Sequence, residues 1–89
     1  MHENKNVPIR FTSHALDSAR KRGTNQTEVQ MAILGATWRT AKLGRVEAEM
    51  EFDYNGDWNG QHYRFKKVNP VFVAEYNQII VVTVYCFYY

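Results

Sequence analysis

The first quarter of the chain has the polar and apolar pattern of a short helix with marked ends. Thr12 or Ser13 is placed to cap a helix over about residues 13–22, and Gly23 is placed to end it. The stretch before the cap, residues 9–11, is either a short strand or the approach to the helix. We therefore predict one helix that ends at a glycine in the left-handed conformation.

A second helix follows almost at once. It begins at Thr24 or Asn25, and Asn25 and Glu28 have the spacing of a capping box. Its apolar residues recur every three or four positions, as one buried helical face requires: Val29, Ala32, Ile33 and Ala36. Gly35 is expected to end this helix. A basic connection, residues 35–44, comes next.

From residue 45 the period changes to two, which is typical of strands. Apolar residues alternate with glutamates over 45–52, and the following loop contains two Asn-Gly pairs that predict a hairpin. The remaining strands are expected at 61–68, 71–75 and 79–89, with a break at Asn69-Pro70 and a turn at 76–78. The last segment carries no charge, so we expect it inside the sheet rather than at an edge. The predicted fold is α+β, with two helices on one face of a four-stranded antiparallel sheet (α-α-β-β-β-β).

Strand alternation divides the polar residues of this sheet between its two faces. The residues expected to face the helices are Val46, Ala48, Met50, Phe52, Tyr63 and Phe65. The opposite, open face would then carry Glu47, Glu49, Glu51, Arg64, Lys66, Thr83 and Tyr85. Such a mixed face is either a catalytic or RNA-binding surface, or a set of cross-strand ion pairs between the glutamates and Arg64 or Lys66.

Composition narrows the class of protein. The chain has 89 residues, which is one domain, expected over 9–89 behind a flexible leader at 1–8. The single cysteine and three histidines have no metal-ligand spacing, so we expect neither a metal nor another cofactor. No apolar run is long enough to cross a membrane, and no signal peptide is recognised, so a cytoplasmic protein without membrane contact is expected.

Charge is distributed unevenly along the chain. Residues 1–45 hold eight Lys and Arg against three Asp and Glu, whereas residues 46–89 hold three against six. A basic helical half is compatible with a polyanionic partner such as RNA.

Several short motifs carry a resemblance. Phe11-Thr12-Ser13-His14-Ala15, Arg22-Gly23-Thr24 and the closing IVVTVY over 80–85 resemble a family of small bacterial proteins known only as a domain of unknown function. That family is grouped with the barnase, EndoU, colicin and RelE-like (BECR-fold) ribonucleases, many of which are toxins paired with antitoxins. The resemblance covers about residues 9–88. It departs at Thr24, where the family has an aliphatic residue, and at the aromatic end of the chain.

The resemblance implies a metal-independent endoribonuclease of a toxin–antitoxin system that cleaves RNA by attack of the 2′-OH, leaving a 2′,3′-cyclic phosphate. His14 would be the acid or base, with Glu49 or Glu51 as the alternative base. Arg22 and a middle-strand cation would hold the phosphate, Thr83 would donate to it, and Tyr85 would position or stack on a base. The catalytic residues expected on this basis are His14, Arg22, Lys66, Thr83 and Tyr85, and the RNA-binding residues are Arg20, Lys21, Arg64 and Lys67.

The middle-strand cation stays open among Arg64, Lys66 and Lys67. Alternation favours Lys66 and Arg64, whereas a shift of register at Asn69-Pro70 would bring Lys67 to the open face. The implied partners are RNA and a cognate antitoxin. Two other classes of function stand beside this one: a non-catalytic RNA- or protein-binding module of the same fold, and a subunit that forms a homodimer through the C-terminal strand.

Overall fold

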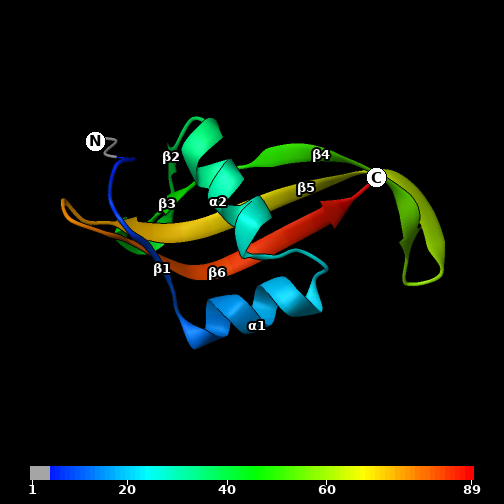
Figure 1. Cartoon of the computed structure of the whole chain (residues 1–89), viewed down its shortest axis with the longest axis horizontal. Helices are drawn as coiled ribbons and strands as arrows, with labels where there is room; N and C mark the ends of the chain where they lie inside the picture. The colour runs from blue at the N-terminus through cyan, green and yellow to red at the C-terminus, as the bar shows by residue number, and fades with distance from the viewer. Residues whose placement is uncertain (1–4) are drawn as a thin grey trace.

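The computed structural model describes residues 5–89, and it has an α+β fold with two helices and a mixed six-stranded sheet (Figure 1). The expected α+β class is therefore confirmed. The elements in chain order are β1 (Ile9–Phe11), α1 (Ser13–Lys21), α2 (Gln26–Gly35), β2 (Arg39–Thr40), the short 3-10 helix η1 (Lys42–Gly44), β3 (Val46–Glu47), β4 (Met50–Trp58), β5 (Gln61–Ala74) and β6 (Ile79–Tyr88).

The sheet is larger than the predicted four antiparallel strands, and it is not purely antiparallel. Its order is β1-β6-β5-β3-β2, and β4 also pairs with β5. Residues 9–11 are a strand that runs parallel to β6, with Ile9 opposite Ile79. The expected strand over 45–52 is divided into β3 and β4, both of which pair with β5.

Both predicted helices are present with side-chain caps. The Thr12 hydroxyl accepts from the Ala15 N–H at the start of α1, and the Asn25 side chain accepts from the Glu28 N–H at the start of α2. Gly23, with φ of +82°, follows the first helix as expected. Local capping chemistry was sufficient to locate these two elements.

The predicted break at Asn69-Pro70 is wrong, because β5 continues through it from residue 61 to residue 74. Proline has no N–H to donate to a neighbouring strand, and here the partner strand is interrupted instead, between β3 and β4. The Asn69 amide donates to the Ala48 carbonyl at 2.7 Å within this interruption, and Ala48 N–H donates to the Pro70 carbonyl. The asparagine thus supplies a donor beside the residue that lacks one.

The two Asn-Gly pairs of the hairpin have different roles. Asn59-Gly60 forms the turn, with φ of +51° and +82°. Asn55, with φ of +47°, lies where the register of β4 against β5 shifts, which is a β-bulge. Figure 1 shows the hairpin curling away from the rest of the sheet beyond this point.

The core lies between the helices and one face of the sheet. Its largest fully buried side chains come from α2, β5 and β6, and they are Phe72, Ile33, Ile79, Val29, Val68, Val81, Val84 and Pro70. Trp38 packs edge-on against Phe72 with ring centroids 5.0 Å apart. Because Val68, Pro70 and Phe72 all point toward the helices, Lys67, Asn69 and Val71 between them point to the opposite face.

Of the predicted leader, residues 1–4 lie outside the described residues. Lys5 donates to the carbonyls of Leu34 and Ala36 at the end of α2, and Pro8 accepts from the Ile79 N–H. Within residues 5–89, no helix is long and apolar enough to span a membrane.

Candidate functional site

Helix α1 lies against the edge of β6, and one polar side chain of the helix and those of its two capping residues bond to the strand's backbone. Thr12 donates its hydroxyl to the Val82 carbonyl, and the Ser18 hydroxyl accepts from the Val84 N–H at 3.1 Å. Arg22 donates to the Val84 carbonyl at 2.9 Å. These bonds fix the residues of α1 relative to the side chains that β6 presents.

This contact brings together four of the five residues expected to be catalytic. His14 Nε2 lies 3.3 Å from Thr83 Oγ1, a hydrogen bond whose direction depends on the histidine tautomer. The Arg22 guanidinium lies over the Tyr85 ring at 5.1 Å from its centroid, within the range of a cation–π contact. A solvent-exposed imidazole, a hydroxyl, a guanidinium and a phenol ring therefore meet at one edge of the sheet.

Lys66, the fifth expected catalytic residue, points to the other face of the sheet, so its predicted orientation is wrong. Its side chain is 9% exposed, and Nζ lies 2.8 Å from Glu28 Oε1 and 2.9 Å from the Gly23 carbonyl. The Thr24 hydroxyl donates to the same Glu28 oxygen. The cause is that Val68, and not Phe65, faces the core at this part of β5: Lys66 is two positions from Val68 and shares its face.

Phe65 also departs from its expected face. It lies against Tyr89 with ring centroids 5.8 Å apart, on the side of the sheet away from Glu28. Lys67 is therefore the middle-strand cation on the open face, where its Nζ lies 3.9 Å from Glu49 and 5.8 Å from the Tyr89 ring centroid. Arg64 is exposed and stands over the Phe65 ring.

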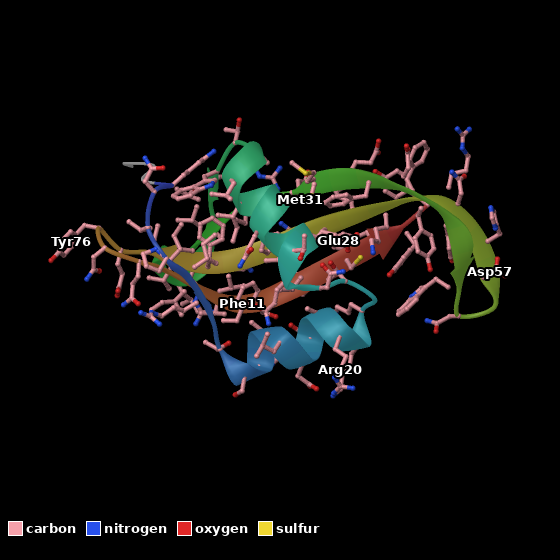
Figure 2. The ribbon with its side chains drawn as sticks, in the orientation of Figure 1. Phe11, Arg20, Glu28, Met31, Asp57 and Tyr76 are labelled. Atoms are coloured by element: carbon pink, nitrogen blue, oxygen red, sulfur yellow. The ribbon has the colours of Figure 1, made fainter. Side chains whose placement is uncertain are left out.

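Arg20 and Lys21 are both engaged by Asp17 on α1, at 2.5 and 2.9 Å. Hydrogen bonds from Lys21, the larger cause, and from Arg20 hold the pKa of the Asp17 carboxyl below its usual value. Figure 2 shows the Arg20 side chain on the outer side of α1, away from the sheet. The structure places neither cation in contact with Thr83 or Tyr85.

The strand carboxylates considered as alternative bases are committed to other partners. Glu51 accepts from the Tyr89 hydroxyl, which raises the pKa of that phenol. Glu49 lies 3.4 Å from Arg39 as well as near Lys67. These contacts are cross-strand pairs of the kind expected on an open sheet face, made by Arg39 and Lys67 in place of Arg64 and Lys66.

A cavity of about 360 Å³ opens beside the His14–Thr83 pair. Thr83 and Tyr85 lie on one side of it, and the turn that holds Lys42 and Arg45 lies on the other. Its lining residues are Ala41, Lys42, Leu43, Arg45, Glu47, Val71, Thr83 and Tyr85. Sequence reasoning missed the two turn cations as site residues, although the basic and glycine-bounded composition of this connection was a signal.

The open face of β6 also carries a row of exposed aromatic side chains. Tyr85, Phe87 and Tyr89 are 41%, 50% and 47% exposed at alternate positions. The Tyr85 and Phe87 rings are nearly parallel, with centroids 6.5 Å apart. Flat rings at this spacing are suited to stacking with bases of a single-stranded nucleic acid.

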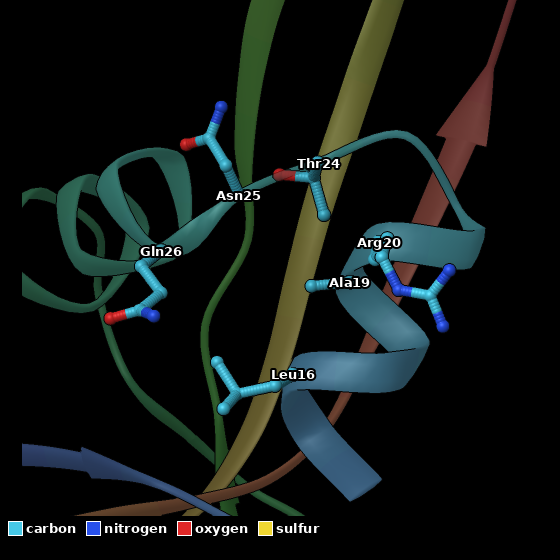
Figure 3. A pocket seen from close by; sticks show the side chains of 6 residues that line it. All are labelled: Leu16, Ala19, Arg20, Thr24, Asn25 and Gln26. Carbon is cyan, nitrogen blue, oxygen red and sulfur yellow. The ribbon is translucent and has the colours of Figure 1, made fainter. Parts of the chain in front are cut away.

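A second cavity, of about 330 Å³, lies between α1 and the start of α2 (Figure 3). Leu16 and Thr24 point into it, whereas the Arg20 side chain turns away. Its lining residues are Leu16, Ala19, Arg20, Thr24, Asn25 and Gln26. Since it joins no acid or base to a cation, it offers less for catalysis than the cavity at Thr83.

The arrangement at Thr83 has the groups that proton transfer and phosphate binding require. An imidazole transfers protons near neutral pH, and a hydroxyl and a guanidinium donate to phosphate oxygens. Comparison of the chain with protein-family models, with curated proteins and with solved structures finds no match. The site is therefore interpreted from its own geometry.

Proposed function

We propose that this protein is a metal-independent endoribonuclease whose active site lies on the open face of the sheet, where α1 meets β6. The observation that carries the proposal is the 3.3 Å approach of His14 Nε2 to Thr83 Oγ1 beside the Arg22–Tyr85 contact. These four residues come from opposite ends of the chain, and they are four of the five catalytic residues that the family resemblance implies. The toxin role and a cognate antitoxin partner belong to the same proposal.

In the proposed reaction, the 2′-OH of a ribonucleotide attacks the adjacent phosphorus. A P–O2′ bond forms and the P–O5′ bond breaks, which gives a 2′,3′-cyclic phosphate and a free 5′-hydroxyl. His14 transfers one of the two protons, either by accepting that of the 2′-OH or by donating one to the leaving oxygen, and solvent water exchanges the other. Arg22 and Thr83 donate hydrogen bonds to the phosphate oxygens as negative charge develops on them.

Lys66 has no part in this proposal, because it is held by Glu28 and the Gly23 carbonyl on the other face. Lys67 and Arg64 remain candidates for contact with RNA outside the reacting phosphate. Of the strand carboxylates, Glu47 is the one that lines the cavity with Thr83, although Arg39 pairs with it at 2.8 Å.

The test is cleavage of mixed single-stranded RNA in excess EDTA. We expect the wild type to cut and His14→Ala to lose at least about a hundredfold in rate, the typical contribution of a positioned general acid or base. His62→Ala is the matched control, because His62 is exposed on the hairpin and contacts Asp57 at 3.2 Å. Equal rates for wild type and His14→Ala would contradict the proposed role of His14.

A second candidate function is favoured by the bonds of α1 to the strand edge. Thr12, Ser18 and Arg22 each bond to the backbone of β6, so these motif residues have a structural use that requires no catalysis. A non-catalytic RNA-binding module would keep them for that reason. It is distinguished by RNA affinity without any cleavage in the assay above.

A further inference from the structure

The turn between β2 and β3 forms one wall of the cavity at Thr83. The Ala41 N–H donates to the Arg45 carbonyl at 2.8 Å, and the Arg45 N–H donates to the Lys42 carbonyl at 3.2 Å. Leu43 and Gly44 both have positive φ, +61° and +71°. The turn is thus tightly closed, and it holds Lys42 and Arg45 on the same cavity.

The cavity has an excess of positive charge. Among residues 5–89, neither Lys42 nor Arg45 forms an ion pair or a side-chain hydrogen bond. Its one carboxylate, Glu47, is already engaged by Arg39 at 2.8 Å and by the Asn69 amide at 3.3 Å. Two cations without partners beside a neutralised carboxylate favour an anionic ligand.

The same cavity shares two of its residues with the proposed active site. Thr83 bonds to His14 and Tyr85 lies under Arg22, yet both also line the cavity with Lys42 and Arg45. Arg22 lies at the edge of β6, and the turn that holds Lys42 and Arg45 precedes β3, so only β5 lies between the two strands concerned. One nucleic acid strand that crosses the sheet can therefore reach both groups.

We propose that this cavity is a nucleotide subsite for single-stranded RNA, in which Lys42 and Arg45 hold the phosphate that neighbours the scissile one and Tyr85 stacks on the intervening base. The inference rests on the proposed function, since it names where the rest of the substrate binds. Aromatic rings beside unpaired cations are the usual means of holding a single strand.

The test measures RNA binding separately from cleavage. The probe is a fluorescein-labelled 12-nucleotide 2′-O-methyl RNA of mixed sequence, which lacks the 2′-OH nucleophile, and fluorescence anisotropy is recorded between 50 and 200 mM NaCl. Lys42→Gln and Arg45→Gln should each weaken binding about threefold to tenfold. Each should also reduce the slope of log affinity against log salt by about 0.7, the value for one phosphate contact on a single strand.

The matched control is Lys5→Gln. It removes the same charge from the helix-covered side of the sheet, where Lys5 bonds to the end of α2, and it should leave the salt slope unchanged. Thermal unfolding of each variant checks that it is folded. If both Lys42→Gln and Arg45→Gln keep the wild-type affinity and the wild-type slope of log affinity against log salt, the inference is overturned. The cavity would then bind another anionic ligand, such as an acidic protein segment. Failure of the wild type to bind the probe would overturn it equally.

The inference and the proposed function can fail separately. If Lys42→Gln and Arg45→Gln weaken probe binding while unmodified RNA is never cleaved, the subsite holds and the nuclease proposal fails. If cleavage depends on His14 but KM is unchanged in the two turn variants, the nuclease proposal holds and the subsite is wrong. With both correct, the turn variants raise KM and leave kcat unchanged, whereas His14→Ala lowers kcat.

Discussion

Replacing Lys66 by alanine tests whether this lysine stabilises the fold rather than acting on a substrate. The substitution removes a charge-assisted bond to the Gly23 carbonyl and the ion pair with Glu28 at 2.8 Å. A hydrogen bond of a charged group contributes about 1.5–3 kcal/mol, and removing one partner of a fully buried pair costs about 3–5 kcal/mol. Glu28 is 21% exposed and keeps its bond from Thr24, so the cost lies below that upper range.

We therefore expect Lys66→Ala to lower the free energy of unfolding by about 2–3 kcal/mol. In a domain of this size that loss lowers Tm by about 8–24 °C. The assay is urea unfolding followed by tryptophan fluorescence, with thermal melting as a second measurement. The matched control is Lys67→Ala, whose ion pair with Glu49 is long, at 3.9 Å, with both side chains about one-third exposed, and which should cost about 0.5 kcal/mol or less.

A double-mutant cycle with Glu28→Gln isolates the pair itself, and it should give a coupling energy of about 1–2 kcal/mol. Equal costs for Lys66→Ala and Lys67→Ala would refute the reasoning about the buried pair. A Lys66→Ala protein with wild-type Tm and no RNA cleavage would indicate that Lys66 acts in catalysis and does not stabilise the fold.

Three further predictions concern Gly23, with Gly44 as its control, Tyr88 and Cys86. Gly23→Ala should cost more than about 2 kcal/mol in urea unfolding, because φ is +82° and a Cβ would overlap the Tyr88 hydroxyl and lie 2.7 Å from the Trp58 ring. Gly44→Ala, at φ of +71° with open space around it, should cost only about 1 kcal/mol. Burial raises the pKa of Tyr88 far above its usual value, so the unfolded chain loses this proton first and the free energy of unfolding should fall as pH rises above about 10. Tyr88→Phe should make that fall shallower between pH 9 and 11, and an unchanged slope would contradict the assignment. Burial also raises the pKa of the Cys86 thiol, which should react with a thiol reagent at pH 8 more slowly in the folded protein than in urea.

Local signals in the sequence were sufficient for the helices but not for the faces of the sheet. Thr12 and Asn25 cap their helices through bonds to residues three positions away, so the information is within one turn. The face of Lys66 depends instead on whether Phe65 or Val68 faces the core. These two apolar residues have opposite parity in β5, so a period of two cannot decide between them; in the structure Val68 is buried and Phe65 lies against Tyr89 on the open face.

The candidate site likewise depends on non-local contacts that the sequence pattern does not reveal. His14 and Thr83 are 69 positions apart, and their approach follows from the parallel pairing of β1 with β6, a non-local contact. The family resemblance named these residues, whereas periodicity alone did not bring them together. Lys42 and Arg45 were missed because their turn lies beside Thr83 only in three dimensions.

The most direct test of the central claim compares cleavage of two substrates in excess EDTA. One is an RNA oligonucleotide that the wild type cuts at a mapped position, and the other carries a single 2′-deoxynucleotide immediately 5′ of that position. The account predicts cleavage of the first substrate only, with a 2′,3′-cyclic phosphate end that is lost in His14→Ala. Equal cleavage of both substrates, or cleavage that is unchanged in His14→Ala, would contradict it.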